Sequence, residues 1–145
     1  MNTLIEKAFF LKKTQLFSEL DLDLVLAIAD KAEERKLEDK EAIFSCNQDA
    51  HCLYVIVSGK VHVFDDEANE LATLFAPDYF GDESLFNRQA RGYGVQSNGE
   101  SVLILISRTH LIEIMLECPQ VGLALIRAYA DPTSFRKRVV EDKTL

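Results

Sequence analysis

The sequence predicts a mainly β fold, an antiparallel sandwich or small barrel, with helices at both ends of the chain. Apolar residues follow helical spacing up to about residue 34, alternate with period two from there to residue 107, and then return to helical spacing. The middle region holds many short strand candidates and no long helix, which is typical of sandwiches and barrels. We expect one domain overall, with a helical segment over 1–34, a barrel over 35–107, and helices with a tail over 108–145.

The N-terminal segment predicts a helix from about residue 18 to residue 34. Ser18 stands three residues before Asp21, the spacing with which many helices begin, so its hydroxyl can accept a hydrogen bond from the amide three residues on. Apolar residues then recur at helical spacing, with charged residues on the opposite face. A shorter helix is expected before it, over about residues 4–11.

The middle segment predicts short strands separated by turns. Its clearest run, residues 53–57, alternates between the two faces, and Ser58-Gly59 interrupts it as a turn would before a strand over 61–64. The other strand candidates are 36–37, 42–44, 71–75, 93–96 and 102–106, with turn clusters at 47–49, 65–67, 76–78 and 97–99.

Two helices are expected after the last strand candidate. Apolar residues share one face from Leu111 to Cys118, and Pro119 suits the first turn of a second helix because that position needs no amide proton. Asp131-Pro132 is expected to end this second helix. The basic triplet at 136–138 is expected to be a solvated helix end.

Composition excludes several classes of protein. The chain has 145 residues, of which 48% are hydrophobic, so folding without a metal or disulfide is expected. Its 24 acidic and 16 Lys and Arg residues give a net charge of −8, which disfavours binding to nucleic acid or anionic lipid. The run 102–106 is far shorter than the roughly 20 residues of a membrane helix, so no membrane insertion is expected. Three cysteines give no disulfide framework, and we expect a cytoplasmic chain.

One segment, residues 80–86 followed by Arg91, carries a pattern with chemical meaning. Gly81 leads out of a strand candidate into a single helical turn, whose first amides and positive dipole end can form an anion site. Arg91, ten positions after Gly81, can add a forked pair of donors suited to phosphate. Spacing alone favours the alternative, an ordinary loop with a solvated arginine.

The order of these segments resembles the cyclic nucleotide-binding domains of bacterial catabolite-activator proteins and protein kinase A regulatory subunits. Residues 53–63 resemble the central hairpin of the family, with Gly59 at its turn, and residues 71–81 resemble the strand that leads into its phosphate cassette. The resemblance extends from Leu16 to Tyr129. It implies an antiparallel eight-stranded jelly-roll barrel, or double-stranded β-helix, with N-terminal helices and C-terminal lid helices.

The cassette of the family reads Phe-Gly-Glu-x-Ala/Ser-Leu, and after a gap Pro-Arg-Ala/Ser-Ala/Thr. The chain departs from this pattern at three places that would touch ligand. Asp82 replaces the glutamate that bonds the ribose 2′-hydroxyl, Gly92 stands where Ser, Thr or Ala follows the arginine, and Tyr93 is bulky where the family is small. Glu83 adds a second carboxylate and is expected to face outward. The residues that fit the pattern are Gly81, Ser84, Leu85 and Arg91.

The resemblance implies a non-enzymatic regulatory domain that binds a cyclic nucleotide, cAMP rather than cGMP, and needs no cofactor. The amides after Gly81, together with Arg91, would hold the cyclic phosphate, and Asp82 would hold the ribose. The helix that contains Leu123 to Tyr129 would act as a lid and pass occupancy to an attached effector domain or to a second subunit. The residues expected at the ligand are Gly81, Asp82, Glu83, Ser84, Leu85, Arg91, Gly92 and Tyr93.

A second interpretation stays open, because the departures at Asp82, Gly92 and Tyr93 also suit a degenerate copy. Such a copy would keep the barrel as a protein-interaction or dimerisation module, and the apolar run 121–126 offers a helix face for a homodimer.

Metal binding and catalysis are not expected. Cys46, His51, Cys52 and His62 fit no strong zinc spacing. No serine or cysteine lies in a recognisable nucleophile elbow.

Overall fold

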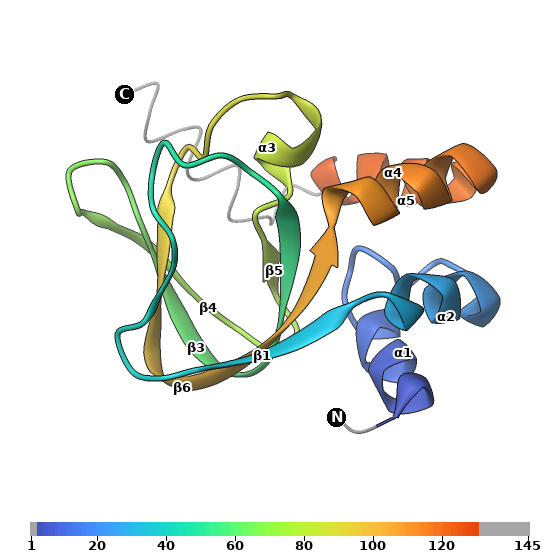
Figure 1. Cartoon of the computed structure of the whole chain (residues 1–145), viewed down its shortest axis with the longest axis horizontal. Helices are drawn as coiled ribbons and strands as arrows, with labels where there is room; N and C mark the ends of the chain where they lie inside the picture. The colour runs from blue at the N-terminus through green and yellow to red at the C-terminus, as the bar shows by residue number, and fades with distance from the viewer. Residues whose placement is uncertain (1–2, 131–145) are drawn as a thin grey trace.

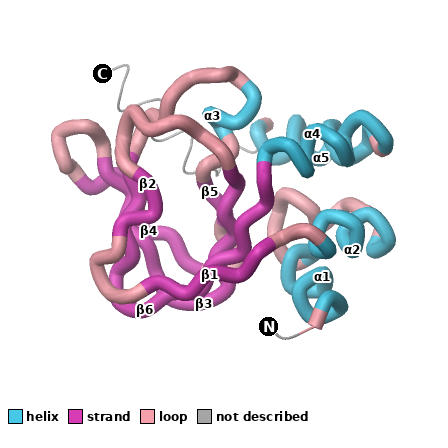
Figure 2. The backbone as a smooth tube through the Cα atoms, viewed as in Figure 1, coloured by secondary structure: helices cyan, strands magenta, loops and turns pink. Residues whose placement is uncertain are grey.

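The chain folds into a curved antiparallel sheet with a layer of helices against one end (Figure 1). The computed structural model describes residues 3–130. Figure 2 shows the strands gathered on one side and four helices on the other, namely α1 (Leu4–Lys12), α2 (Leu22–Asp30), α4 (Arg108–Glu117) and α5 (Pro119–Tyr129). The short helix α3 (Glu83–Phe86) stands apart from that layer, beside the sheet. The predicted mainly antiparallel β fold with flanking helices is confirmed.

The N-terminal part forms two helices. The first, α1 (Leu4–Lys12), confirms the short helix that the sequence predicts. The second, α2 (Leu22–Asp30), is shorter than the predicted range 18–34, so that prediction is wrong at both ends. Ser18 does not cap a helix, because its hydroxyl donates to a carbonyl three residues earlier, at 3.2 Å, and Asp21 takes the N-cap position.

The sheet is antiparallel throughout, with the strand order β1-β6-β3-β4, while β2 pairs with β6 and β5 pairs with β3. The described residues contain six strands where the resemblance implies eight, since two of them are long and continuous. The strands are β1 (Glu33–Leu37), β2 (Ala42–Phe44), β3 (Cys52–Phe64), β4 (Glu70–Phe75), β5 (Tyr79–Phe80) and β6 (Gly94–Ser107).

Strands β3 and β6 run straight through positions where the sequence predicts turns. Gly59 in β3 has φ +84° and Gly99 in β6 has φ +79°, and the register of this pair shifts around Gly59. A Cβ at Gly59 would lie 2.4 Å from the carbonyl oxygen of Glu100 on the facing strand. These glycines therefore serve a β-bulge and not hairpin turns, so the predicted turns at Gly59 and at 97–99 are wrong.

The C-terminal part confirms the two predicted helices, α4 (Arg108–Glu117) and α5 (Pro119–Tyr129), with Pro119 in the first turn. The imidazole Nε2 of His110 on α4 lies 3.1 Å from the carbonyl oxygen of Ala27, which ties α4 to α2. The predicted helix end at 131–132 and the basic triplet at 136–138 lie outside the described residues. Within residues 3–130, no helix combines the length and the apolar character that crossing a bilayer requires.

Side chains on the two faces of the sheet enter two separate cores, because successive residues of a strand point to opposite faces. On β3, Leu53 and Val55 join one core and Tyr54 and Ile56 join the other. We call the first core the helical cluster; its members include Leu11, Phe17, Val25, Ile28, Leu53, Val55, Leu85, Ile104, Ile106, Leu111, Val121 and Leu125. We call the second the barrel cluster; it comprises Leu37, Phe44, Tyr54, Ile56, Val61, Val63, Leu74, Phe80, Tyr93, Val95, Leu103 and Leu105.

Candidate functional site

The segment that the sequence singles out lies between β5 and β6 and approaches the barrel cluster. Gly81 follows β5 directly and has φ +83°, a conformation that glycine adopts without strain. A Cβ at Gly81 would lie 3.1 Å from Nη1 of Arg91 and 3.1 Å from the ring of Tyr54. Glycine is therefore required here both for the turn and for the close approach of the arginine.

Arg91 is buried inside the barrel, with 2% of its surface exposed, so the alternative of a solvated arginine is wrong. Its Nη1 donates to the carbonyl oxygen of Gly81, and its Nη2 donates to that of Cys52 at 2.7 Å. The guanidinium carbon lies 4.2 Å from the centre of the Phe44 ring, a cation–π contact. Sequence reasoning placed Arg91 beside Gly81, and the structure brings the two together.

The backbone of Arg91 is fixed as firmly as its side chain. Its amide donates to the carbonyl of Gln48 at 2.7 Å, and its carbonyl accepts from the amide of Asn47 at 2.7 Å. Asn47 has φ +74°, which asparagine tolerates better than most residues. The turn before β3 thus holds Arg91 in place.

The positive charge of Arg91 is compensated only in part. The ion pairs between described residues join His62 to Glu70 and Arg127 to Glu19, and they do not include Arg91. Its Nε–H is buried without an acceptor among the described residues. A buried charge or donor without a partner costs free energy. Arg91 is therefore a ready partner for an anion that enters the barrel.

Tyr93 points into the same space and contacts the cassette. The phenol is 4% exposed, and its ring centre lies 5.6 Å from that of Phe44. The hydroxyl oxygen accepts from the amide of Gly81 at 2.8 Å and the hydroxyl donates to Oε1 of Glu83 at 2.8 Å. The expectation that Glu83 faces outward is therefore wrong, because this hydrogen bond draws its carboxylate toward Tyr93.

The other predicted residues differ in burial and in the contacts that they make. The Asp82 side chain is 1% exposed and precedes α3 at its N-cap position. The Ser84 hydroxyl donates to the carbonyl of Ala90 at 3.3 Å, which ties the two ends of the cassette together. Leu85 is fully buried in the helical cluster, so it anchors the cassette. Gly92 is partly exposed beside Arg91.

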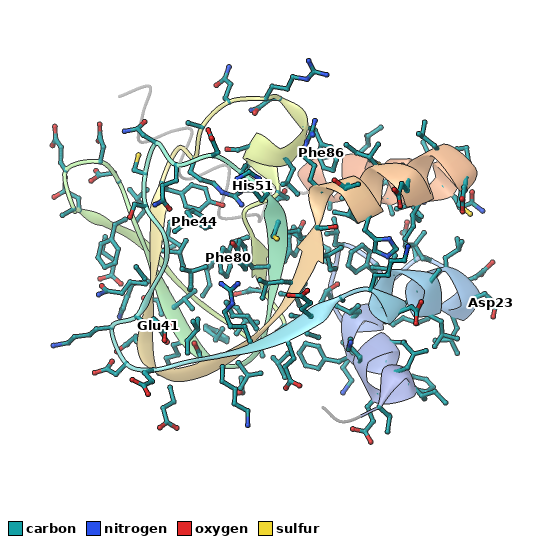
Figure 3. The ribbon with its side chains drawn as sticks, in the orientation of Figure 1. Asp23, Glu41, Phe44, His51, Phe80 and Phe86 are labelled. Carbon is teal, nitrogen blue, oxygen red and sulfur yellow. The ribbon has the colours of Figure 1, made fainter. Side chains whose placement is uncertain are left out.

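Aromatic residues that were not among those expected at the ligand form the walls of this site. Tyr54 and Phe80 stack with ring centres 5.1 Å apart and an interplanar angle of 9°, and Phe44 packs against both. Figure 3 shows Phe44 and Phe80 inside the curve of the sheet. The period-two pattern of residues 53–57 placed Tyr54 opposite Leu53, but it could not show that the Arg91 guanidinium would lie over the rings of Phe44 and Tyr54.

Burial changes the acid–base properties of two wall residues. Burial raises the pKa of the Tyr54 phenol above its ordinary value, and the nearby Cys52 thiol acts in the same direction. Burial also raises the pKa of Cys52, against the opposing effect of Arg35 and Arg91. Both groups are thus neutral near pH 7, and Cys52 lacks the thiolate that a nucleophile requires.

Beside the cassette lies a hollow of about 570 Å³. Arg91 and Tyr93 do not line it, whereas Ser84 and Leu85 do, together with His51 and Arg108. In the part of the chain that the structure describes, no group of three or more His, Cys, Asp or Glu side chains could hold a metal ion.

The chain is similar to known proteins in sequence. Residues 34–118 match the family described as "Cyclic nucleotide-binding domain". Over 107 residues the chain is 27% identical to the potassium channel AKT2/3 of Arabidopsis thaliana. This match covers 72% of this chain and 13% of the channel. The chain spans between 13% and 21% of the length of the curated relatives it matches.

Solved structures share the fold at low sequence identity. The regulatory subunit of a cAMP-independent protein kinase A from Trypanosoma brucei matches with a TM-score of 0.76 and 22% identity, over 91% of this chain and 49% of that one. The regulatory domain of Toxoplasma gondii PKA, in a co-crystal with cAMP, matches with a TM-score of 0.77 and 19% identity, over 88% and 50% of the two chains.

Proposed function

We propose that this chain, which belongs to the cyclic nucleotide-binding domain family over residues 34–118, is a regulatory domain. From this premise we propose that it binds a cyclic nucleotide, cAMP in preference to cGMP, and passes occupancy on through α5. We propose further that it is not an enzyme, uses no cofactor and acts in the cytoplasm, where it controls an attached effector domain or a second subunit.

The observation that supports this function best is the buried guanidinium of Arg91. It lies inside the barrel with a donor that lacks an acceptor, and it contacts carbonyl groups rather than carboxylates. A monoanionic cyclic phosphate would supply the missing acceptor and the missing charge. The chain carries a net charge of −8, which repels a polyanion. A buried cation within such a chain is therefore suited to one small anion.

Each residue around Arg91 has a proposed role. The Gly81 amide and Arg91 would hold the phosphate, and Asp82, buried beside them, would accept from the ribose 2′-hydroxyl. Phe44 and Tyr54 would pack against the sugar and base. The hydroxyl of Tyr93 must leave the Gly81 amide when the phosphate arrives, because that single N–H serves one strong acceptor at a time.

Support for cAMP comes from the Toxoplasma gondii regulatory domain, whose structure contains cAMP, but the two barrels share only 19% identity. We therefore base the proposed preference for cAMP over cGMP on the family resemblance. A direct comparison of the two nucleotides tests it.

A chain of contacts links the cassette to the C-terminal helices and supports the proposed transmission. Nε of Arg108, the first residue of α4, donates to the carbonyl of Leu85 at the cassette. Helix α4 leads directly into α5 at Pro119. A movement of α3 on binding would therefore be passed to α4 and α5. Ligand can drive this shift only if it binds one helix arrangement more tightly than the other.

Isothermal titration with cAMP and with cGMP tests the proposal. We expect saturable binding of cAMP, weaker binding of cGMP, and loss of both in Arg91→Gln. Lys36→Gln, which removes an exposed cation on β1, is the matched control and should bind as the natural chain does. No heat and no thermal shift with either nucleotide at millimolar concentration would refute nucleotide sensing while leaving the fold intact.

A second candidate function rests on Tyr93, whose hydroxyl already occupies the Gly81 amide. A barrel that fills its own site would serve as an interaction or dimerisation module without ligand. Helices α4 and α5 expose Leu116 (80%), Leu123 (53%) and Ile126 (65%), which could form a homodimer face. The similar Trypanosoma brucei chain is the regulatory subunit of a protein kinase A that is described as cAMP-independent. A ligand-independent dimer in light scattering, together with no nucleotide binding, would favour this candidate.

A further inference from the structure

The Tyr93 hydroxyl occupies the Gly81 amide, one of the two groups that the proposed function assigns to the phosphate. Its hydroxyl oxygen lies 2.8 Å from the Gly81 nitrogen, the distance of a good N–H···O hydrogen bond. The backbone amide has one proton to donate. A phosphate oxygen can therefore reach this amide only after the hydroxyl has left it.

Glu83 holds the tyrosine in this position and adds a negative charge beside the site. The Tyr93 hydroxyl donates to Oε1 of Glu83 at 2.8 Å, so the carboxylate is one hydrogen bond away from the phosphate position. Hydrogen bonds to an ionised acceptor are stronger than those between neutral groups. A phosphate that displaced the Tyr93 hydroxyl would break this hydrogen bond. The phosphate and the Glu83 carboxylate, both anions, would then lie close together.

The ring of Tyr93 also takes up the volume beside the cation. It is 4% exposed, packs in the barrel cluster, and has its centre 5.6 Å from that of Phe44, the ring on which the Arg91 guanidinium lies. Removing the ring would leave an opening next to Arg91, lined by aromatic side chains and by the backbone of the cassette.

Resting on the proposed function, we infer that Tyr93 is a displaceable internal plug, held by Glu83, that sets the nucleotide affinity of this domain. The plug consists of the Tyr93 ring and of the two hydrogen bonds that its hydroxyl makes, to the Gly81 amide and to Glu83. The natural chain binds cyclic nucleotide only after it gives up the Gly81–Tyr93 and Tyr93–Glu83 hydrogen bonds and moves the ring. The plug therefore lowers the affinity below what Gly81 and Arg91 alone would support.

Substitutions of Tyr93 test the plug directly. We expect Tyr93→Ala to bind cAMP at least about tenfold more tightly than the natural chain, because both hydrogen bonds and the ring are gone. Tyr93→Phe removes only the hydroxyl and should give a smaller gain. Tyr79→Phe is the matched control, since Tyr79 is another buried tyrosine, on β5, but packs in the helical cluster. It should bind as the natural chain does.

Glu83→Gln tests the role of the carboxylate with little change of shape. We expect it to raise the affinity for cAMP several-fold by removing the charge beside the phosphate. Glu117→Gln, at the exposed end of α4, is its control and should leave the affinity unchanged. If Tyr93→Ala does not fold, as judged by circular dichroism, Tyr93→Phe and Glu83→Gln carry the test.

The outcomes separate the plug from the proposed function. Binding by Tyr93→Ala but not by the natural chain would support the plug and refute nucleotide sensing by the natural chain. Binding by the natural chain that Tyr93→Ala, Tyr93→Phe and Glu83→Gln do not strengthen would refute the plug and leave the function standing. If no folded variant binds cAMP at millimolar concentration, the plug is refuted as well.

Discussion

The helical cluster and the barrel cluster share strands β3 and β6, but they differ in what they bury. Aliphatic side chains predominate in the helical cluster, where Leu11, Val25 and Leu111 have no exposed surface. The barrel cluster holds aromatic rings, and beside it lie the buried side chains of Arg91 and Asp82. This difference indicates that one face of the sheet mainly stabilises the fold. The other face buries polar side chains, which costs free energy, and forms the candidate site.

The largest effect on stability is expected in the helical cluster. Phe17→Ala removes a fully buried ring and should lower the free energy of unfolding by about 3–5 kcal/mol, because the surrounding side chains relax only in part. Urea unfolding followed by circular dichroism measures it. A loss below about 1 kcal/mol would contradict the idea that this cluster carries the stability of the domain.

A smaller loss is expected at the bulge that joins the two long strands. Gly59→Ala should cost about 1–3 kcal/mol, because φ is +84° and the new Cβ would press on the Glu100 carbonyl. Gly99→Ala is the matched control: φ is similar, at +79°, but nothing lies within 4 Å of the new Cβ. Urea unfolding of both variants should show the larger loss at Gly59, and equal losses would argue against the steric contact.

Replacement of the buried cation should affect stability less than it affects binding. Arg91→Met keeps an apolar chain near Phe44 but leaves the carbonyls of Gly81 and Cys52 without these donors. We expect a change of about 1–2 kcal/mol in the free energy of unfolding, together with complete loss of cAMP binding. Unfolding and calorimetry on one sample measure both. A variant that still binds cAMP would show that Arg91 only packs against the barrel cluster and does not hold the ligand.

The smallest effect is expected from alkaline titration of the barrel cluster. Burial raises the pKa of Tyr54, so the folded state holds this proton at a pH where the unfolded chain has lost it. The stability from this group is fully present below the unfolded value of about 10 and falls as the pH rises through the higher folded value. Urea unfolding at pH 8 and at pH 10.5 should therefore show a loss of stability that is smaller in Tyr54→Phe. An unchanged loss would assign the titration to other groups.

Much of the fold follows from hydrophobic period, and the errors have a common cause. Strand β2 and helix α5 lie where the sequence predicts them, because alternation and a proline at the first helical turn are local signals. Gly59 and Gly99 misled the prediction, since positive φ serves a bulge as well as a turn. Only the pairing of β3 with β6 shows that these positions form a bulge and not a turn.

The site was predictable in its parts and not in its contacts. The spacing of Gly81 and Arg91, with the family resemblance, brought both to one place. The inward turn of Glu83 depends on a hydrogen bond to Tyr93, and the position of Tyr93 depends on packing against Phe44 from a distant strand. No local pattern reports such contacts, so the sequence showed that Tyr93 is bulky but not that it reaches the Gly81 amide.

The central claim is that Gly81 and Arg91 form the phosphate site of this domain. Nuclear magnetic resonance of the nitrogen-15-labelled chain during a cAMP titration tests it most directly. The account predicts saturable shifts of the Gly81 amide, as it exchanges the tyrosine oxygen for phosphate, and of the Arg91 Nε–H, as it gains an acceptor. Both signals staying fixed at millimolar cAMP, while the spectrum remains that of a folded protein, would contradict it.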